Sequence, residues 1–101
     1  MQKFLIHINT DSELIAYEAI SLGLTLATFD HLVQFVLGEQ SLTLLTDATT
    51  RIYGMIQSLE LYDIAPALHQ FADDIIIDEP VRQALKFGTA NAQDYDICLN
   101  F

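Results

Sequence analysis

The segment Lys3–Glu13, with the sequence KFLIHINTDSE, joins a predicted strand to a predicted helix. Its first part, Lys3–Asn9, is dense in Phe, Leu and Ile, which is typical of a strand buried inside a sheet. The four residues that follow have the pattern of a capping box, in which Thr10 caps a helix and the Glu13 side chain reaches back to it. The segment therefore predicts the strand-to-helix junction with which an α/β domain begins.

Strand and helix patterns continue to alternate along the chain. Strands are expected at Lys3–Asn9, His31–Leu37, Ala67–Phe71, Ile75–Ile77 and Tyr95–Phe101. Helices are expected from the capping box to about Thr28, over Glu39–Leu45, from an N-cap at Asp47 to Leu61–Ile64, and from Glu79 to a C-cap at Gly88. The alternation predicts a single domain over residues 1–101, a three-layer α/β/α fold with a mostly parallel sheet of about five strands.

The predicted last strand, Tyr95–Phe101, holds the only cysteine of the chain. Ile97, Cys98 and Leu99 form an unbroken apolar run, as expected of a strand that is covered on both faces. A thiol buried between Ile97 and Leu99 is hidden from substrates and is a poor nucleophile. The sequence thus indicates that Cys98 packs in the core, which favours a subunit that works through a partner over an enzyme.

The composition also favours a partner. Apolar residues make up 51% of the chain and charged residues only 18%, whereas soluble proteins average about 25% charged residues. With few charges to cover its surface, the domain is expected to bury part of that surface against another chain. The net charge of -10 repels phosphate, so direct binding to nucleic acid is not expected.

The expected location is the cytoplasm. One cysteine cannot form an internal disulfide, so nothing indicates an oxidising compartment. The start of the chain lacks the features of a signal peptide, and no apolar run is long enough for a transmembrane helix.

Four carboxylates, Asp73, Asp74, Asp78 and Glu79, bracket the predicted strand Ile75–Ile77. Such a cluster could bind Mg²⁺ and serve as a phospho-acceptor site, which is one alternative function. That site also needs a lysine after the last strand, which this sequence does not supply. A solvated acidic edge is the favoured interpretation, and a stand-alone acidic protein-interaction domain is a further alternative.

The three histidines, His7, His31 and His69, do not have the spacing of metal ligands. His7 and His69 would approach each other if the first and third strands were neighbours, but partly buried strand histidines are the favoured interpretation. The Asn9–Ser12 loop lacks glycine, and its carboxylates would repel a phosphate. No catalytic residue, cofactor or metal ligand is therefore expected.

Two segments resemble a known family. Ser58–Ile64, SLELYDI, resembles the "GLYDI"-type segment of the DsrF/TusC proteins, and Tyr95–Phe101, YDICLNF, is similar to their terminal "YDVILRF"-type strand. The order of the predicted elements agrees with this family over nearly the whole chain. The resemblance implies a subunit of the DsrE/DsrF/DsrH (TusBCD) sulfur-relay family.

Members of that family form cytoplasmic hetero-oligomers of three homologous subunits, which pass persulfide sulfur towards tRNA wobble-uridine 2-thiolation or sulfur oxidation. The relay cysteine sits on the DsrE/TusD-type subunit, in a loop after the third strand, and the DsrF/TusC-type subunit is structural. The resemblance implies DsrE/TusD-like and DsrH/TusB-like partners for this chain. No cysteine stands in the region just after Phe71, where Ala72, Asp73 and Asp74 precede the next predicted strand, and this agrees with a non-catalytic role. The motif suggests Leu61, Tyr62 and Asp63 as interface residues.

Overall fold

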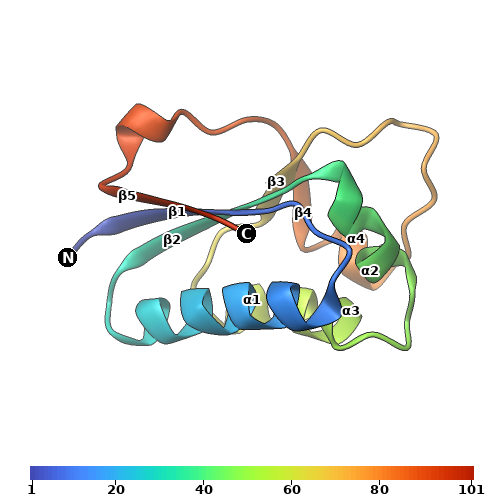
Figure 1. Ribbon diagram of the computed structural model, residues 1–101, viewed down its shortest axis with the longest axis horizontal. Coiled ribbons are helices and arrows are strands. Elements are labelled where there is room, and N and C mark those ends of the chain that lie inside the picture. The colour runs from blue at the N-terminus through green and yellow to red at the C-terminus, as the bar shows by residue number, and fades with distance from the viewer.

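The computed structural model describes residues 1–101 and contains a five-stranded, all-parallel sheet (Figure 1). The strand order is β4-β3-β2-β1-β5. The strands are β1 (Lys3–Ile8), β2 (Leu32–Leu37), β3 (Ala67–His69), β4 (Leu85–Phe87) and β5 (Ile97–Asn100). The α-helices are α1 (Glu13–Thr28), α2 (Leu42–Thr46), α3 (Arg51–Met55) and α4 (Glu79–Arg82). Three 3₁₀ helices are η1 (Glu39–Ser41), η2 (Ile56–Tyr62) and η3 (Ala92–Asp94).

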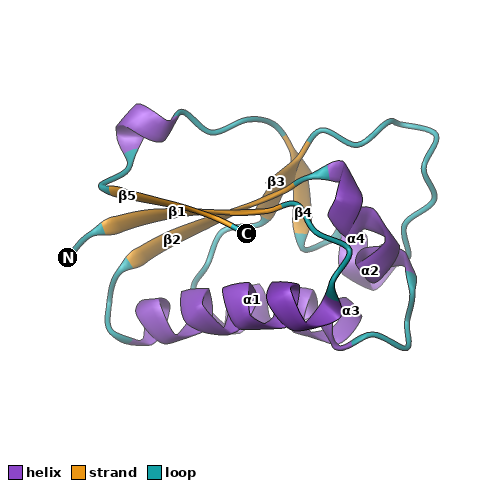
Figure 2. Ribbon diagram, viewed as in Figure 1, coloured by secondary structure: helices purple, strands orange, loops and turns teal.

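The predicted fold class is confirmed, since a five-stranded parallel sheet with helices is consistent with a three-layer α/β/α fold. Strands β1 to β4 are added one after another in the same direction across the sheet. The chain then crosses back over the sheet, and β5 pairs on the other side of β1. Right-handed crossovers therefore put the connections on opposite faces. Figure 2 shows α1 and α3 on one face and the short η3 on the other. None of the helices is long and apolar enough to cross a membrane.

The core lies between the sheet and α1. Along β1 the side chains of Phe4, Ile6 and Ile8 are buried, as are Phe35 in β2 and Ile20 in α1. These residues belong to a single cluster of 18 buried hydrophobic residues. Period-2 burial in the strand and period-3.6 burial in the helix place these apolar faces against each other.

The N-cap of α1 lies two residues after the predicted cap. Ser12, not Thr10, is the N-cap, because its Oγ accepts a hydrogen bond from the Ile15 N–H at 3.3 Å. The Thr10 hydroxyl accepts the Ser12 N–H instead. The Glu13 carboxylate does not reach back to the cap, since it accepts the Arg51 N–H at 2.6 Å and so ties α1 to α3. The capping-box prediction was therefore wrong in its residues, although the helix was correctly located.

The long helix predicted after Asp47 is also displaced. Thr50 is the N-cap of α3, with its hydroxyl accepting the Tyr53 N–H at 3.2 Å. Asp47 instead accepts hydrogen bonds from the Thr49 backbone and hydroxyl, which lower the pKa of its carboxyl. The helical segment ends where Asp63 adopts a left-handed conformation with φ 57°.

The prediction of a strand at Ile75–Ile77 was wrong. This segment is a loop, the Ile75 N–H bonds the Ala72 carbonyl, and Ile76 is 88% exposed. The fourth strand is β4, in a place where a helix was expected to continue to Gly88. The helix α4 stops at Arg82 because Leu85 and its neighbours pair with β3 instead. Gly88 therefore follows a strand and is not a helix C-cap.

The strand β5 forms one edge of the sheet. It pairs only with β1, in a register that places Cys98 beside Leu5 and Asn100 beside His7. Cys98 is exposed, and its Sγ lies 3.8 Å from the Ala92 carbonyl oxygen. The prediction that this strand is covered on both faces, with Cys98 packed in the core, was wrong. An edge strand has only one neighbour, so its outward side chains lack the cover that a central strand receives.

Candidate functional site

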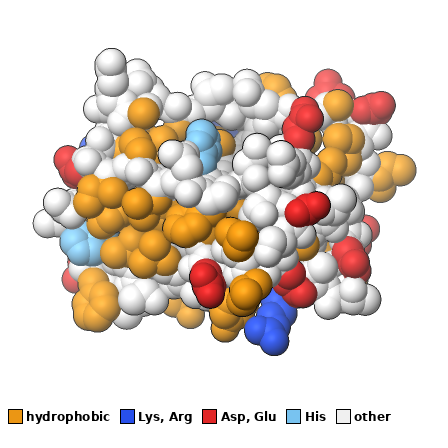
Figure 3. Space-filling view, viewed as in Figure 1, with side chains coloured by type: hydrophobic (Ala, Val, Ile, Leu, Met, Phe, Trp, Pro, Cys, Tyr) orange, Lys and Arg blue, Asp and Glu red, His pale blue; other side chains and the backbone are white.

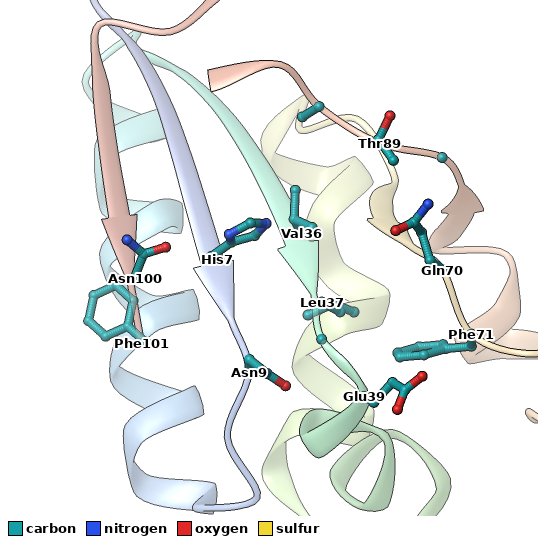
Figure 4. Close-up of a pocket in the computed structure, with 13 residues that line it drawn as sticks. His7, Asn9, Val36, Leu37, Glu39, Gln70, Phe71, Thr89, Asn100 and Phe101 are labelled. Atoms are coloured by element: carbon teal, nitrogen blue, oxygen red, sulfur yellow. The ribbon is translucent and has the colours of Figure 1, made fainter. Parts of the chain in front are cut away.

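A cavity of about 650 Å³ opens at the carboxyl ends of the strands (Figure 4). All five strands reach it. Its lining residues are His7, Asn9, Val36, Leu37, Gly38, Glu39, Gln70, Phe71, Gly88, Thr89, Ala90, Asn100 and Phe101. In open parallel sheets ligands bind outside the carboxyl ends of the strands, so this cavity is the candidate functional site.

The cavity includes the point beside β1 where the order of the strands reverses, with β2 on one side of β1 and β5 on the other. Connections leave β1 towards β2 on one face of the sheet, and the last connection returns to β5 on the other. His7 in β1 lies in register with Val36 on one side and Asn100 on the other. Such a switch point leaves a gap between the two diverging crossovers, into which side chains and ligands can extend.

A close backbone approach shapes one wall of the cavity. The Gly38 N–H bonds the Ile8 carbonyl at 2.8 Å, and a Cβ atom on Gly38 would overlap the Asn9 side chain. Asn9 Oδ1 accepts the Gln40 N–H at 3.0 Å, which joins the end of β1 to η1. Glycine at position 38 therefore permits the contact that holds these two loops together.

Most of the polar side chains in the cavity have no partner within the chain. His7, Glu39, Gln70, Thr89 and Asn100 make no side-chain hydrogen bond to another residue. Figure 4 shows His7 and Val36 between Asn100 on one side and Gln70 and Thr89 on the other. These groups are available for a ligand.

Few charged or nucleophilic side chains line the cavity. No cysteine, lysine or arginine lines it, and Cys98 lies elsewhere on β5. Nowhere in the structure do three or more His, Cys, Asp or Glu side chains gather in a way that could hold a metal ion. The arrangement is suited to non-covalent binding by hydrogen bonds and apolar contact.

The predicted acidic cluster does not converge. Asp78 Oδ2 accepts a hydrogen bond from the Tyr53 hydroxyl at 2.7 Å, and this bond raises the pKa of Tyr53. Glu79 pairs with Arg82 at 2.9 Å, and that hydrogen bond lowers the pKa of the Glu79 carboxyl. Asp73 and Asp74 are exposed in the loop before them. Two of the four carboxylates thus have structural partners in place of a shared metal.

The histidines are also separated. His7 and His69 are not neighbours, because β2 lies between β1 and β3. His69 Nδ1 accepts the Phe71 N–H at 3.1 Å, and its ring stacks on Phe71 with centroids 4.7 Å apart. Partial burial there lowers the pKa of His69. His69 and His31 are partly buried as predicted, whereas His7 is exposed.

The predicted interface residues lie near the opposite end of the sheet. Tyr62 and Asp63 line a second hollow of about 470 Å³, next to the start of β2. Leu32 and Tyr95 also line it, and Tyr62 is 41% exposed. Leu61 is 84% exposed but does not line the hollow. The motif residues are therefore exposed, and they lie near the amino end of β2, away from the cavity at the carboxyl ends of the strands.

Sequence reasoning did not identify the cavity at the carboxyl ends. A signal was present for part of it, because His7, Asn9 and Gln70 stand at the ends of predicted strands, where parallel sheets bind ligands. The position of Thr89 near the end of a strand could not be predicted, because the segment that forms β4 was predicted to be helical. Asn100 was read only as part of a terminal strand.

Comparison with known proteins found no match among family models, curated proteins or solved structures.

Proposed function

We propose that this chain is a non-catalytic structural subunit of a cytoplasmic sulfur-relay complex of the DsrE/DsrF/DsrH (TusBCD) type. The sulfur-relay part of the proposal rests on the motif segments Ser58–Ile64 and Tyr95–Phe101 and on the order of strands and helices. The subunit role rests on the surface. Its partners are DsrE/TusD-like and DsrH/TusB-like chains, and the sulfur ends in tRNA 2-thiolation or in sulfur oxidation.

The observation that carries the subunit role is the number of exposed apolar side chains. Eleven large hydrophobic residues are exposed in a chain of 101 residues. Figure 3 shows hydrophobic side chains gathered on the left half of the face that carries β5 and α1. On α1 and just after it, Ile15, Leu22 and Phe29 are 43%, 37% and 70% exposed. Exposed apolar groups that gather on one face are typical of a surface buried against another chain.

The absence of a suitable thiol supports the non-catalytic part of the proposal. In this family the relay cysteine follows the third strand, and in this chain β3 is followed by Gln70, Phe71 and Ala72. Cys98 stands in β5, at the edge of the sheet, and lines neither of the two hollows. In this proposal the persulfide is therefore carried by a partner, although the Cys98 thiol is exposed.

The assembly is tested by co-expressing the chain with DsrE/TusD-like and DsrH/TusB-like proteins, followed by size-exclusion chromatography with light scattering. We expect one co-eluting complex with equal amounts of the three chains. Leu61→Ser and Tyr62→Ser are expected to weaken it. Ile76→Ser is the matched control, since Ile76 is 88% exposed but lies in the loop before α4. A wild-type chain that elutes alone in the presence of both partners would contradict the proposal.

The non-catalytic role has its own test. In the assembled complex, Cys98→Ser is expected to leave persulfide transfer unchanged, while substitution of the partner's relay cysteine abolishes it. Loss of transfer in the Cys98→Ser complex, with assembly intact, would show that this chain carries sulfur.

A further inference from the structure

The cavity at the carboxyl ends presents two free carboxamides on opposite sides. Asn100, the last residue of β5, lies on one side, and Gln70, which follows β3, lies on the other, with His7 between them (Figure 4). Each carboxamide offers a donor and an acceptor side by side. Thr89 adds a hydroxyl, and His7 adds a ring with one donor and one acceptor nitrogen when neutral. The cavity therefore carries paired donors and acceptors that the fold itself does not use.

Apolar groups supply the remaining walls. Val36 forms part of the floor along β2, and the rings of Phe71 and Phe101 stand at the margins. Flat aromatic and aliphatic surfaces of this kind favour a flat, apolar-faced ligand whose polar atoms lie along its edges. The cavity volume of about 650 Å³ falls within the range of about 300–1,000 Å³ typical of small-molecule sites.

The charges around the cavity select against anions. Glu39 is the one acidic side chain in the lining, and no lysine or arginine side chain lines it. The chain as a whole carries a net charge of -10. A phosphate or carboxylate would meet repulsion from Glu39 and from the field of the whole protein, with no cation to offset it. This lining therefore disfavours an anionic ligand.

From these three observations we propose that the cavity binds a small, uncharged heteroaromatic molecule with amide-like hydrogen-bonding edges, of the nucleobase or nucleoside class. Asn100 and Gln70 bond donor and acceptor atoms at opposite edges of the ligand, as carboxamides do with base edges elsewhere. Val36 contacts one face of the ligand, between the margins at which Phe71 and Phe101 stand. This binding is separate from the subunit role and requires no partner chain.

The test is a titration of the ¹⁵N-labelled full chain with the four common ribonucleosides, followed by NMR. We expect saturable shifts confined to the backbone amides around His7, Gln70, Thr89 and Asn100, for at least one nucleoside. The matching 5′-monophosphate should bind more weakly, and the difference should shrink as salt screens the repulsion. Spermidine serves as the cationic probe, and saturation of these amides by spermidine alone would overturn the proposal.

Two variants sharpen the result. Asn100→Leu removes one exposed carboxamide and should weaken nucleoside binding by about fivefold or more. Gln93→Leu is the matched control, because Gln93 is an exposed amide on η3 outside the cavity. Glu39→Gln removes the negative charge of the lining, so it should strengthen monophosphate binding by a larger factor than it changes nucleoside binding. Shifts spread over the whole chain, no saturation, or equal binding by the Asn100→Leu and Gln93→Leu variants would each overturn the proposal.

Discussion

Gly23 of α1 lies directly against the ring of Phe35 in β2. A Cβ atom at position 23 would overlap the ring atoms, and both residues are buried. Because Gly23 has no side chain, α1 can lie close to the sheet at Phe35, the largest fully buried side chain of the structure. Because cores are close-packed, there is no free volume into which Phe35 could move without displacing its neighbours.

Gly23→Ala is therefore expected to destabilise the chain. Overpacking typically costs about 1–3 kcal/mol, which exceeds the gain from the better helix propensity of alanine. The measurement is the free energy of unfolding in urea. Gly54→Ala is the control, because a Cβ at that position in α3 would meet nothing within 4 Å beyond the adjacent residues and backbone of its own helix. That variant should gain about 0.5–1 kcal/mol, and equal effects of the two substitutions would contradict the contact.

His69 should make stability depend on pH. Burial holds its folded-state pKa below the ordinary value of 6.5, so the unfolded chain binds the proton more tightly. The contribution to stability is complete above pH 6.5 and is lost as the pH falls from there through the lower, folded-state pKa. Protonation also prevents Nδ1 from accepting the Phe71 N–H. Urea unfolding at pH 8 and pH 5.5 should show a smaller pH dependence in His69→Gln than in the wild type.

His7 provides the control for that measurement, since it is exposed on β1. His7→Gln should retain the pH dependence of the wild type over the same range. If His69→Gln and His7→Gln behave alike, the pH dependence belongs to other groups.

The edge position of β5 predicts an accessible thiol. Cys98 is exposed, so the folded chain should react with a thiol reagent such as DTNB without prior unfolding. Cys98→Ser should change the free energy of unfolding by less than about 0.5 kcal/mol, as expected of an exposed position. A thiol that reacts only in denaturant would show that β5 is covered.

Tyr53 and Asp78 link α3 to the start of α4. The Tyr53 hydroxyl donates a hydrogen bond to the Asp78 carboxylate. This bond and the nearby negative charge disfavour ionisation of the phenol, so the pKa of Tyr53 lies above its ordinary value of 10.0. Asp78→Asn should return this pKa towards 10.0 in a spectrophotometric titration at alkaline pH. Asp74→Asn is the control, because Asp74 makes no hydrogen bond to Tyr53. An unchanged titration in Asp78→Asn would refute the interaction.

The elements that were predicted correctly are the longer ones, in which the apolar residues repeat over several periods. The strand β1, the helix α1 and the strand β2 were expected at nearly the observed positions, because each has several periods of its apolar repeat. The short elements failed. Ile75–Ile77 has strong strand propensity but lies in a loop, since no strand of the sheet pairs with it. Leu85 fitted a helical stripe with Val81, yet it pairs with Ala67 in the sheet.

The candidate cavity was less predictable than the elements around it. His7 and Asn100 are separated by most of the chain and meet only because β5 pairs with β1. Thr89 reaches the cavity only because β4 exists. The interface residues Leu61, Tyr62 and Asp63 were expected from a motif, and they are exposed, but their contact with a partner remains a prediction.

The sequence by itself determined the class of the fold, because the alternation of strand and helix periods is encoded in neighbouring residues. Only the tertiary structure decided the strand order β4-β3-β2-β1-β5. That order makes β5 an edge strand, exposes Cys98 and brings His7 and Asn100 together. Strand pairing depends on hydrogen bonds between segments far apart in the chain, and no local pattern specifies which segments will meet.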